Sequence, residues 1–176
     1  MAIGTLNSHI YTAIQMQQNL NSAYLVIGRK TAWANDNNPP EEDIKTDKLE
    51  EIIGYKKLKQ YSLARPLNVG ETAETAPYQT VTYNGLVWVL IPVEKAYEEK
   101  AHWLYVTAEI LPTDFPTGMY RQVGVNVGLQ PTSGVTKPNL LPTEVFNSGV
   151  LLFYENRQPQ NRTSSVHVLE KFMIKV

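Results

Sequence analysis

The side chains that could do chemistry are few, and none has the spacing of a reactive site. His9, His102 and His167 are far apart and lack the His-x-His or His-Glu-x-x-His spacing of metal ligands. The chain has no cysteine, which excludes disulfides and thiolate chemistry. It contains no Gly-x-Ser-x-Gly nucleophile elbow and no glycine-rich phosphate loop. We therefore expect no catalytic residue, no cofactor and no metal site. The chain is not expected to be an enzyme.

The acidic residues do not change this expectation. They cluster as neighbours in the sequence, at residues 41–43, 50–51 and 98–99. A glycosidase needs two carboxylates that face each other across a cleft, roughly 5 to 9 Å apart. Adjacent acids are more typical of a solvated face. The run Asn35-Asp36-Asn37-Asn38 offers oxygen ligands, but the order of an EF-hand is missing, so calcium binding is the weaker interpretation.

Aromatic residues make up 10% of the chain, with ten tyrosines and three tryptophans. Exposed aromatic rings can stack on sugars, and Trp33, Trp88 and Trp103 are candidates for such a role. Aromatic enrichment also follows from β-propensity alone, since these residues fit a pleated, half-buried surface. A carbohydrate- or receptor-binding β-module is therefore an alternative function.

Charge and hydropathy exclude two classes of partner. The formal net charge is −1, from 16 basic and 17 acidic residues, which gives no long-range field for nucleic acid or an anionic membrane. No apolar run approaches the ~18 residues that span a bilayer. The N-terminus has no basic start followed by an apolar run, so we expect no signal peptide.

The N-terminal third is predicted to be partly helical. Leu6, Ile10 and Ile14 recur at four-residue steps and predict a helix over residues 5–21. Residues 24–28 form a short apolar strand candidate. Asparagines and two prolines predict a surface loop over residues 35–43. Residues 45–53 predict a short second helix, capped by Asp47 and ended by Gly54.

The remainder of the chain is predicted to be β-rich. Asn84-Gly85 separates two β-branched and aromatic runs, residues 78–83 and 86–92, which is a strong hairpin signal. Further strands are expected over residues 55–67, 102–111, 119–129, 149–155 and 166–176, with turns or loops at 112–118, 130–143 and 156–163. Gly124 and Gly128 indicate a bulge or a close backbone neighbour. We predict a mainly β fold, a β-sandwich or half-open barrel with an N-terminal helix and a short second helix. It is expected to form one structural domain over residues 1–176, with the helix of residues 1–22 as a possible docking arm.

Three blocks of the chain have a distinctive order. Residues 24–40 read as a strand ending in Ile-Gly-Arg, then Thr-Ala-Trp, then an amide-rich run closing in Pro-Pro. Residues 109–124 pass through an acidic turn to Tyr-Arg-Gln-Val-Gly. Residues 149–162 read Gly-x-Leu-Leu-x-Tyr-Glu-Asn-Arg-x-Pro-x-x-Arg. Together these blocks resemble baseplate wedge and other virion structural proteins of contractile-tailed, T-even-like bacteriophages. The resemblance implies an oligomeric scaffold without an active site, located in the tail or baseplate and assembled in the host cytoplasm. A neck or collar adaptor is a second alternative.

The partners expected from this resemblance are other tail and baseplate proteins and further copies of the chain. Protein interfaces favour aromatic and arginine anchors, and long loops can reach adjacent subunits. The N-terminal helix and the loops at 35–43 and 130–143 are therefore expected in contacts between subunits. The candidate interface residues are Trp33, Asn37, Pro39, Pro40, Arg121, Arg157 and Arg162.

Overall fold

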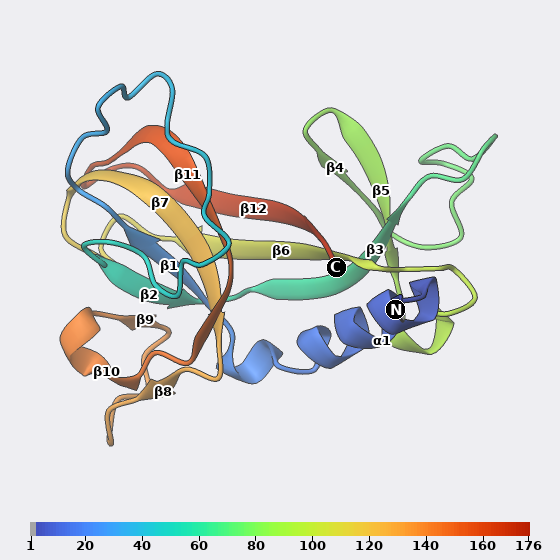
Figure 1. The fold of residues 1–176 in the computed structure, drawn as a ribbon, viewed down its shortest axis with the longest axis horizontal. Helices are drawn as coiled ribbons and strands as arrows, with labels where there is room; N and C mark the ends of the chain where they lie inside the picture. Colours follow the sequence, from blue (N-terminus) through green and yellow to red (C-terminus); the bar gives the residue numbers. More distant parts are fainter. Residues whose placement is uncertain (1–2) are drawn as a thin grey trace. The chain divides into compact units, whose positions relative to one another are not determined.

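The computed structural model describes residues 3–176 (Figure 1). It has one α-helix, α1 (Leu6–Gln17), and three short 3-10 turns: η1 (Leu20–Ser22), η2 (Val93–Lys95) and η3 (Pro142–Glu144). The twelve strands are β1 (Tyr24–Gly28), β2 (Gly54–Lys57), β3 (Gln60–Pro66), β4 (Thr80–Tyr83), β5 (Leu86–Ile91), β6 (Trp103–Ile110), β7 (Gly118–Val127), β8 (Gln130–Pro131), β9 (Asn139–Leu140), β10 (Val145–Asn147), β11 (Val150–Arg162) and β12 (Val168–Lys175).

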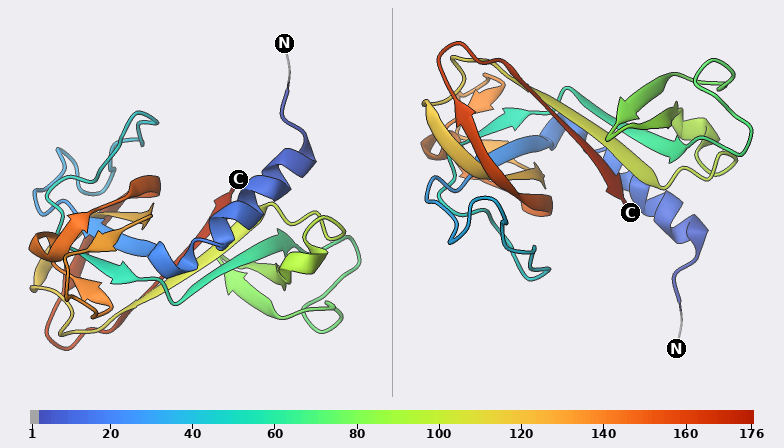
Figure 2. Two further views of the ribbon diagram at one scale, coloured as in Figure 1. Left: turned by 90° about the horizontal axis from the view of Figure 1, so that it is seen from below. Right: turned by 90° about the horizontal axis from the view of Figure 1, so that it is seen from above.

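The chain forms two compact units. Unit 1 contains the described residues up to Leu20 together with Lys59–Thr107 and Lys171–Val176, and unit 2 contains Asn21–Leu58 and Ala108–Glu170. The chain changes unit within β6 and β12, two strands that neighbour each other in one sheet (Figure 2). The single structural domain expected from the sequence stays a prediction.

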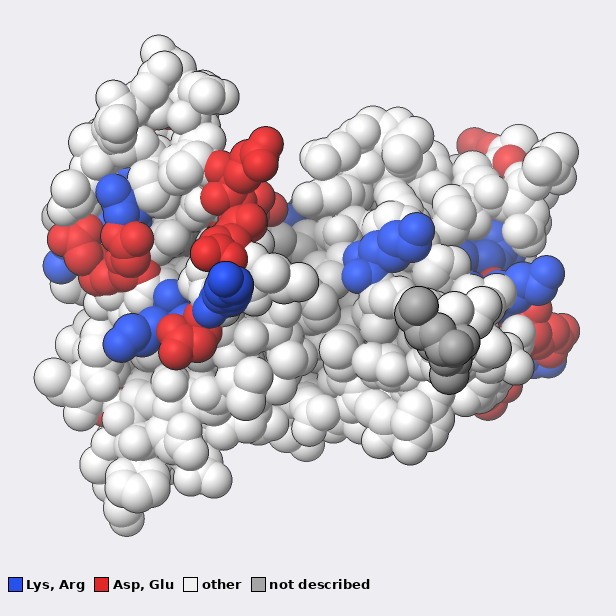
Figure 3. Space-filling model, viewed as in Figure 1, with Lys and Arg blue, Asp and Glu red and all other residues white. Residues whose placement is uncertain are grey.

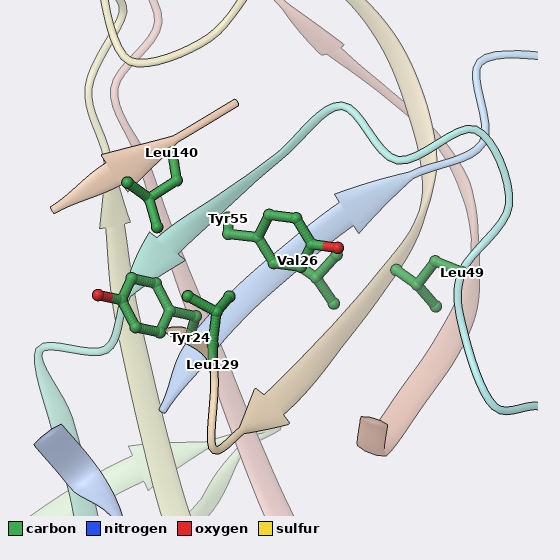
Figure 4. Packing of buried hydrophobic residues seen from close by; sticks show 6 residues of the cluster. All are labelled: Tyr24, Val26, Leu49, Tyr55, Leu129 and Leu140. Atoms are coloured by element: carbon green, nitrogen blue, oxygen red, sulfur yellow. The ribbon is translucent and has the colours of Figure 1, made fainter. Parts of the chain in front are cut away.

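Unit 2 is built on the five-stranded sheet β11-β7-β1-β2-β9, in which each pairing is antiparallel. The sheet curls into a half-barrel (Figure 1). All five residues of β1 are buried, as its continuous apolar sequence predicts for a central strand. The core on one side of it is a cluster of two tyrosines and four aliphatic residues (Figure 4): Tyr24, Val26, Leu49, Tyr55, Leu129 and Leu140.

Unit 1 contains most of the second sheet, β12-β6-β3-β5-β4. Its β4–β5 hairpin turns at Asn84 and Gly85, whose φ angles of 48° and 76° are the positive values that a two-residue type I′ turn needs. α1 lies against β3 and buries Ile10 and Ala13, while Thr5 caps its first turn by accepting from the Ser8 amide at 3.3 Å.

The mainly β class with a half-open barrel is confirmed, as are the N-terminal helix, the strand at 24–28, the loop at 35–43 and the hairpin. The helix is shorter than predicted, and residues 1 and 2 of the expected 1–22 segment lie outside the described residues. The close neighbour expected at Gly124 is also confirmed, because a Cβ atom there would lie 2.7 Å from the carbonyl oxygen of Phe153.

Three expectations were wrong. Residues 45–53 form no helix, because Glu51 adopts a φ of 43° and the backbone of Ile53 donates instead to Ile27 at 2.8 Å. Residues 156–163 are no turn, because β11 continues to Arg162. Residues 149–155 are not fully buried, since β11 is an edge strand that covers only one side of β7. The predicted strand at 55–67 is divided into β2 and β3, and the loop at 130–143 contains β8 and β9.

Candidate protein-binding surface

Residues 29–43 leave β1 as a long loop that a buried arginine of β7 ties down. Arg121 donates through Nε and Nη2 to the two carboxylate oxygens of Asp36, at 2.7 and 2.8 Å, and through Nη1 to the Lys30 carbonyl at 2.5 Å. The arginine is only 6% exposed. The hydrogen bond from Arg121 lowers the pKa of Asp36 to about 2, so the carboxylate is ionised at neutral pH.

We expect acid to loosen this loop. Because the pKa of Asp36 lies below its ordinary value of 3.8, its contribution to stability is present above that value and is lost as the pH falls toward 2. The protection of the amides of residues 29–43 against hydrogen exchange, measured relative to the intrinsic exchange rate at each pH, should fall over this interval. An Asp36→Asn variant is the control: its exchange should be faster at neutral pH and lack the Asp36 step. An unchanged acid response in that variant would contradict the assignment.

Trp33 is the apolar anchor of the loop. Its indole Nε1 donates to the carbonyl oxygen of Arg157 in β11 at 2.9 Å, and its backbone amide donates to Asp36 at 2.8 Å. The Arg29 guanidinium lies 3.8 Å from the centroid of the Trp33 ring, within the range of a cation–π contact. Arg29 also pairs with Glu50. The ring is half-buried and held on several sides.

The start of the loop is fixed by one carboxylate. Glu51 accepts hydrogen bonds from the backbone amides of Lys30 and Thr31, at 2.9 and 2.8 Å, and from the Thr31 hydroxyl at 2.9 Å. The hydrogen bonds from Thr31 lower the pKa of Glu51. Arg29 and Glu51 both have positive φ, at 54° and 43°, a conformation that costs energy in non-glycine residues. These contacts offset that strain and set the path of the chain.

The end of the loop is fixed to β11. The backbone amide of Asn156 donates to Glu42 at 2.8 Å, and its side-chain amide donates to the Pro40 carbonyl at 3.0 Å. Gln158 donates to the carbonyl of Asn37 at 3.1 Å. The amide side chains of β11 therefore bond the backbone of a segment whose prolines lack an amide donor.

The loop leads into a turn, residues 43–46, that we call the Ile44 turn. The Thr46 amide donates to the Asp43 carbonyl at 2.9 Å, which closes the turn. The hydroxyl of Tyr154 holds both ends, because it lies 2.6 Å from the Asp43 amide and 3.0 Å from the Thr46 hydroxyl. Ile44 projects from this turn and is 99% exposed. A large aliphatic side chain thus stands in solvent on a backbone fixed at both ends.

A pocket of about 520 Å³ lies in the loop that precedes the turn. Its lining combines the Trp33 anchor with the amide- and proline-rich part of the loop: Arg29, Trp33, Ala34, Asn35, Asn38, Pro39, Pro40 and Glu41. On the face of the molecule in Figure 3, acidic and basic side chains lie side by side, with large uncharged areas between the charged groups. Such a surface is suited to a partner of mixed polarity.

Most of the interface residues expected from the sequence meet at this surface. Trp33, Asn37, Pro39 and Pro40 belong to the loop, and Arg121 and Arg157 hold it from β7 and β11. Arg121 is nevertheless buried, so its role within the chain is to fix the loop. Contact of these residues with another protein stays a prediction.

Arg157 and Arg162 also have structural roles. The Arg157 side chain pairs with Glu155 and with the buried Glu170, which accepts from the Tyr120 hydroxyl at 2.7 Å. Arg162 lies apart from the loop contacts described above. It is buried and donates to the carbonyls of Leu111, Pro112 and Pro116 at 3.2 to 3.4 Å.

Sequence reasoning missed Ile44, Asp36 and Tyr154. Asp36 was grouped with the asparagines around it. Ile44 lies between the loop predicted at 35–43 and the helix predicted at 45–53, and it was assigned to neither. Ile44 is a single aliphatic residue between two charged residues, Asp43 and Lys45. That isolation was the available signal for an exposed apolar residue.

The other candidates are dispersed or covered. His102 contacts the Lys100 carbonyl at 2.8 Å, and His167 lies 2.9 Å from Glu109. Trp88 is buried and packs on the half-buried Trp103, with ring centroids 4.8 Å apart. Within residues 3–176, no group of three or more histidine, aspartate or glutamate side chains is arranged to hold a metal ion. Over the same residues, no helix has both the length and the apolar character needed to cross a membrane.

The chain is mainly β, and side chains of β7 and β11 hold its long exposed loop in place. A family model described as "Baseplate wedge 3 tail fiber network component" matches residues 1–176, and the chain belongs to this family. It is also 44% identical over 174 residues to "Virion protein 3" of Enterococcus phage phiEF24C, which covers 99% of this chain and 94% of that protein. The expected resemblance to baseplate wedge proteins is confirmed, and the chain is a virion protein of the phage tail and baseplate.

Proposed function

We propose that this protein is a non-enzymatic scaffold subunit that joins other baseplate proteins through the Ile44 turn and loop 29–43, and that also contacts copies of itself. Family membership supports contacts with tail proteins. The observation that carries the proposal is the fully exposed Ile44 on a turn held at both ends by Tyr154. An isolated exposed isoleucine is ordinary on a protein surface. A rigid backbone beneath it, however, removes the ordering cost that usually weakens binding.

Two further segments fit the same role. α1 and the residues just before it have no charged Lys, Arg, Asp or Glu side chain, and Tyr11 is exposed on the outer face of the helix. The segment from β8 to β11 exposes Phe146 and Val150. Its Lys137 and Glu144 pair with each other at 2.8 Å. These surfaces present apolar area with little net charge, as the cores of protein interfaces do.

We expect Ile44→Asp to weaken incorporation into phage particles about ten-fold, because an anchor residue contributes on the order of 1–2 kcal/mol to an interface. The variant is produced in cells infected with phage that lack a functional copy of the gene. Its amount in purified particles is then compared with the wild type. Thermal unfolding should be unchanged, since the Ile44 side chain makes no buried contact.

Val69→Asp is the matched control. Val69 is an equally exposed aliphatic residue in a different loop, so its variant should be incorporated normally. A photo-crosslinking residue at position 44 should link to another baseplate protein in the assembled particle, whereas one at position 69 should not. Normal incorporation of Ile44→Asp, with no crosslink from position 44, would reject the proposed surface.

A further inference from the structure

β4 is the outer edge of its sheet and has one partner, β5. The amide of Leu90 donates to the carbonyl of Gln79 at 2.8 Å, so residue 79 faces β5. In an antiparallel pair, alternate residues direct their N–H and C=O groups toward and away from the partner strand. Val81 and Tyr83 therefore bond β5 as Gln79 does. Thr80 and Thr82 point their amide and carbonyl groups outward.

The other sheet edges have features that oppose strand addition. β12 has Lys171 and Lys175, β9 is two residues long, and β11 has register shifts and a proline, Pro159. Charges, short length, bulges and prolines are the usual protection of an edge. β4, with the sequence Thr-Val-Thr-Tyr, is twice as long as β9, has no charge, bulge or proline, and consists of residues that favour strands.

We infer that β4 pairs with β4 of a second copy of this chain, antiparallel, about a two-fold axis at Val81. This inference deepens the self-contact of the proposed scaffold function and rests on it. The segment Thr80-Val81-Thr82 reads the same in both directions. In this register Thr80 of each copy lies opposite Thr82 of the other, which gives two symmetry-related pairs. The outward amide and carbonyl groups of each pair form two backbone hydrogen bonds, four in total. A self-complementary contact of this kind is what a two-fold dimer requires.

The side chains fit the same register. Val81 packs against the cluster of Ala64, Leu90 and Tyr105, so a second Val81 beside it extends that apolar layer. The opposite face brings threonine next to threonine, a cross-strand pair that stabilises sheets. No charge opposes a like charge. Pairing with an unrelated chain would not require the β4 sequence to read the same in both directions, whereas antiparallel pairing with itself does. We therefore take the strand that pairs with β4 to be β4 of a second copy.

The contact is small, so dimerisation of the purified protein depends on concentration. Sedimentation velocity over a micromolar to millimolar series should show a shift from monomer to dimer. Thr82→Pro tests the backbone, because the amide it removes points outward and a proline is tolerated at such an edge position. The dimer should be lost with the variant still folded. Leu86→Lys is the control, since it changes an exposed apolar residue of the same hairpin without altering the β4 edge, and its dimer should remain.

A charge pair keeps the test independent of the proline. Thr80→Lys with Thr82→Lys should be monomeric, as should Thr80→Glu with Thr82→Glu. Mixing the two double variants should restore a dimer, because each lysine then faces a glutamate. A wild-type monomer across the series, or a dimer that survives all these substitutions, would overturn the inference. Sedimentation tests the β4 contact, whereas incorporation of Ile44→Asp into particles tests the Ile44 turn. A negative result in one experiment therefore does not affect the other.

Discussion

Replacing Asp114 with alanine is expected to lower the free energy of unfolding by about 3–5 kcal/mol, the usual effect of breaking a buried ion pair from one side. Asp114 lies 2.6 Å from the Lys56 ammonium, and the two side chains are only 6% and 10% exposed. The same carboxylate accepts the Leu111 amide at 2.7 Å. The alanine variant leaves the lysine charge buried without its carboxylate and also opens the turn at 111–114. Urea denaturation measures the loss.

Two further variants test whether the loss of stability comes from the burial of the ion pair. Glu98→Ala removes an exposed pair with Lys95, so its effect should stay within about 1 kcal/mol. Lys56→Met combined with Asp114→Leu removes both charges and should recover most of the lost stability, because apolar replacements of buried pairs are often neutral. A mild effect of Asp114→Ala alone, equal to that of Glu98→Ala, would contradict the buried-pair account.

The elements with local signals could be predicted from the sequence. Asn84-Gly85 specifies its turn through backbone conformation alone, so the hairpin did not depend on the rest of the fold. β1 was equally clear, since five consecutive apolar residues before Arg29 match a strand buried on both faces. In these segments the local preference and the tertiary structure agree.

Segments decided by distant contacts could not be predicted. The apolar residues of 45–53 have helical spacing. However, the backbone amide of Glu50 donates to the Gln122 side chain at 2.8 Å, and the Glu51 carboxylate accepts from the Thr31 amide at the start of the loop. Residues 156–162 look like a turn, but the register shift between Asn156 and Gln160 accommodates Pro159 within an edge strand. Tertiary hydrogen bonds outweighed propensity in both places.

The candidate surface was predicted in part. Aromatic and arginine anchors pointed to Trp33, Arg121 and Arg157, and the structure brings them to one loop. The burial of Arg121 beneath the loop could not be predicted, since it depends on the pairing of β7 with β1. The flanking charges of Ile44 were only a weak signal, because its exposure follows from a turn that Tyr154 holds from another strand.

Gly149→Ala is expected to lower the free energy of unfolding by about 3–5 kcal/mol, the sum of a strained backbone and an overpacked site. Gly149 begins the connection into β11 with a φ of 69°. A Cβ atom there would overlap the carbonyl oxygen of Val127 and lie 2.8 Å from the carbonyl carbon of Gly128. Both neighbours are backbone, so no side-chain rotation can relieve the clash. The melting temperature should fall by about 10 °C.

Gly70→Ala distinguishes the two parts of this effect. Gly70 also has a positive φ, of 82°, but no atom lies within 4 Å of a Cβ placed there. Its variant should lose only the conformational part, about 1 kcal/mol. If both glycine variants lost the same small amount, the approach of Gly149 to the Val127–Leu129 backbone would not constrain the fold. A large difference would show that this backbone contact fixes the start of β11, the strand from which Tyr154, Asn156 and Arg157 hold the proposed binding surface.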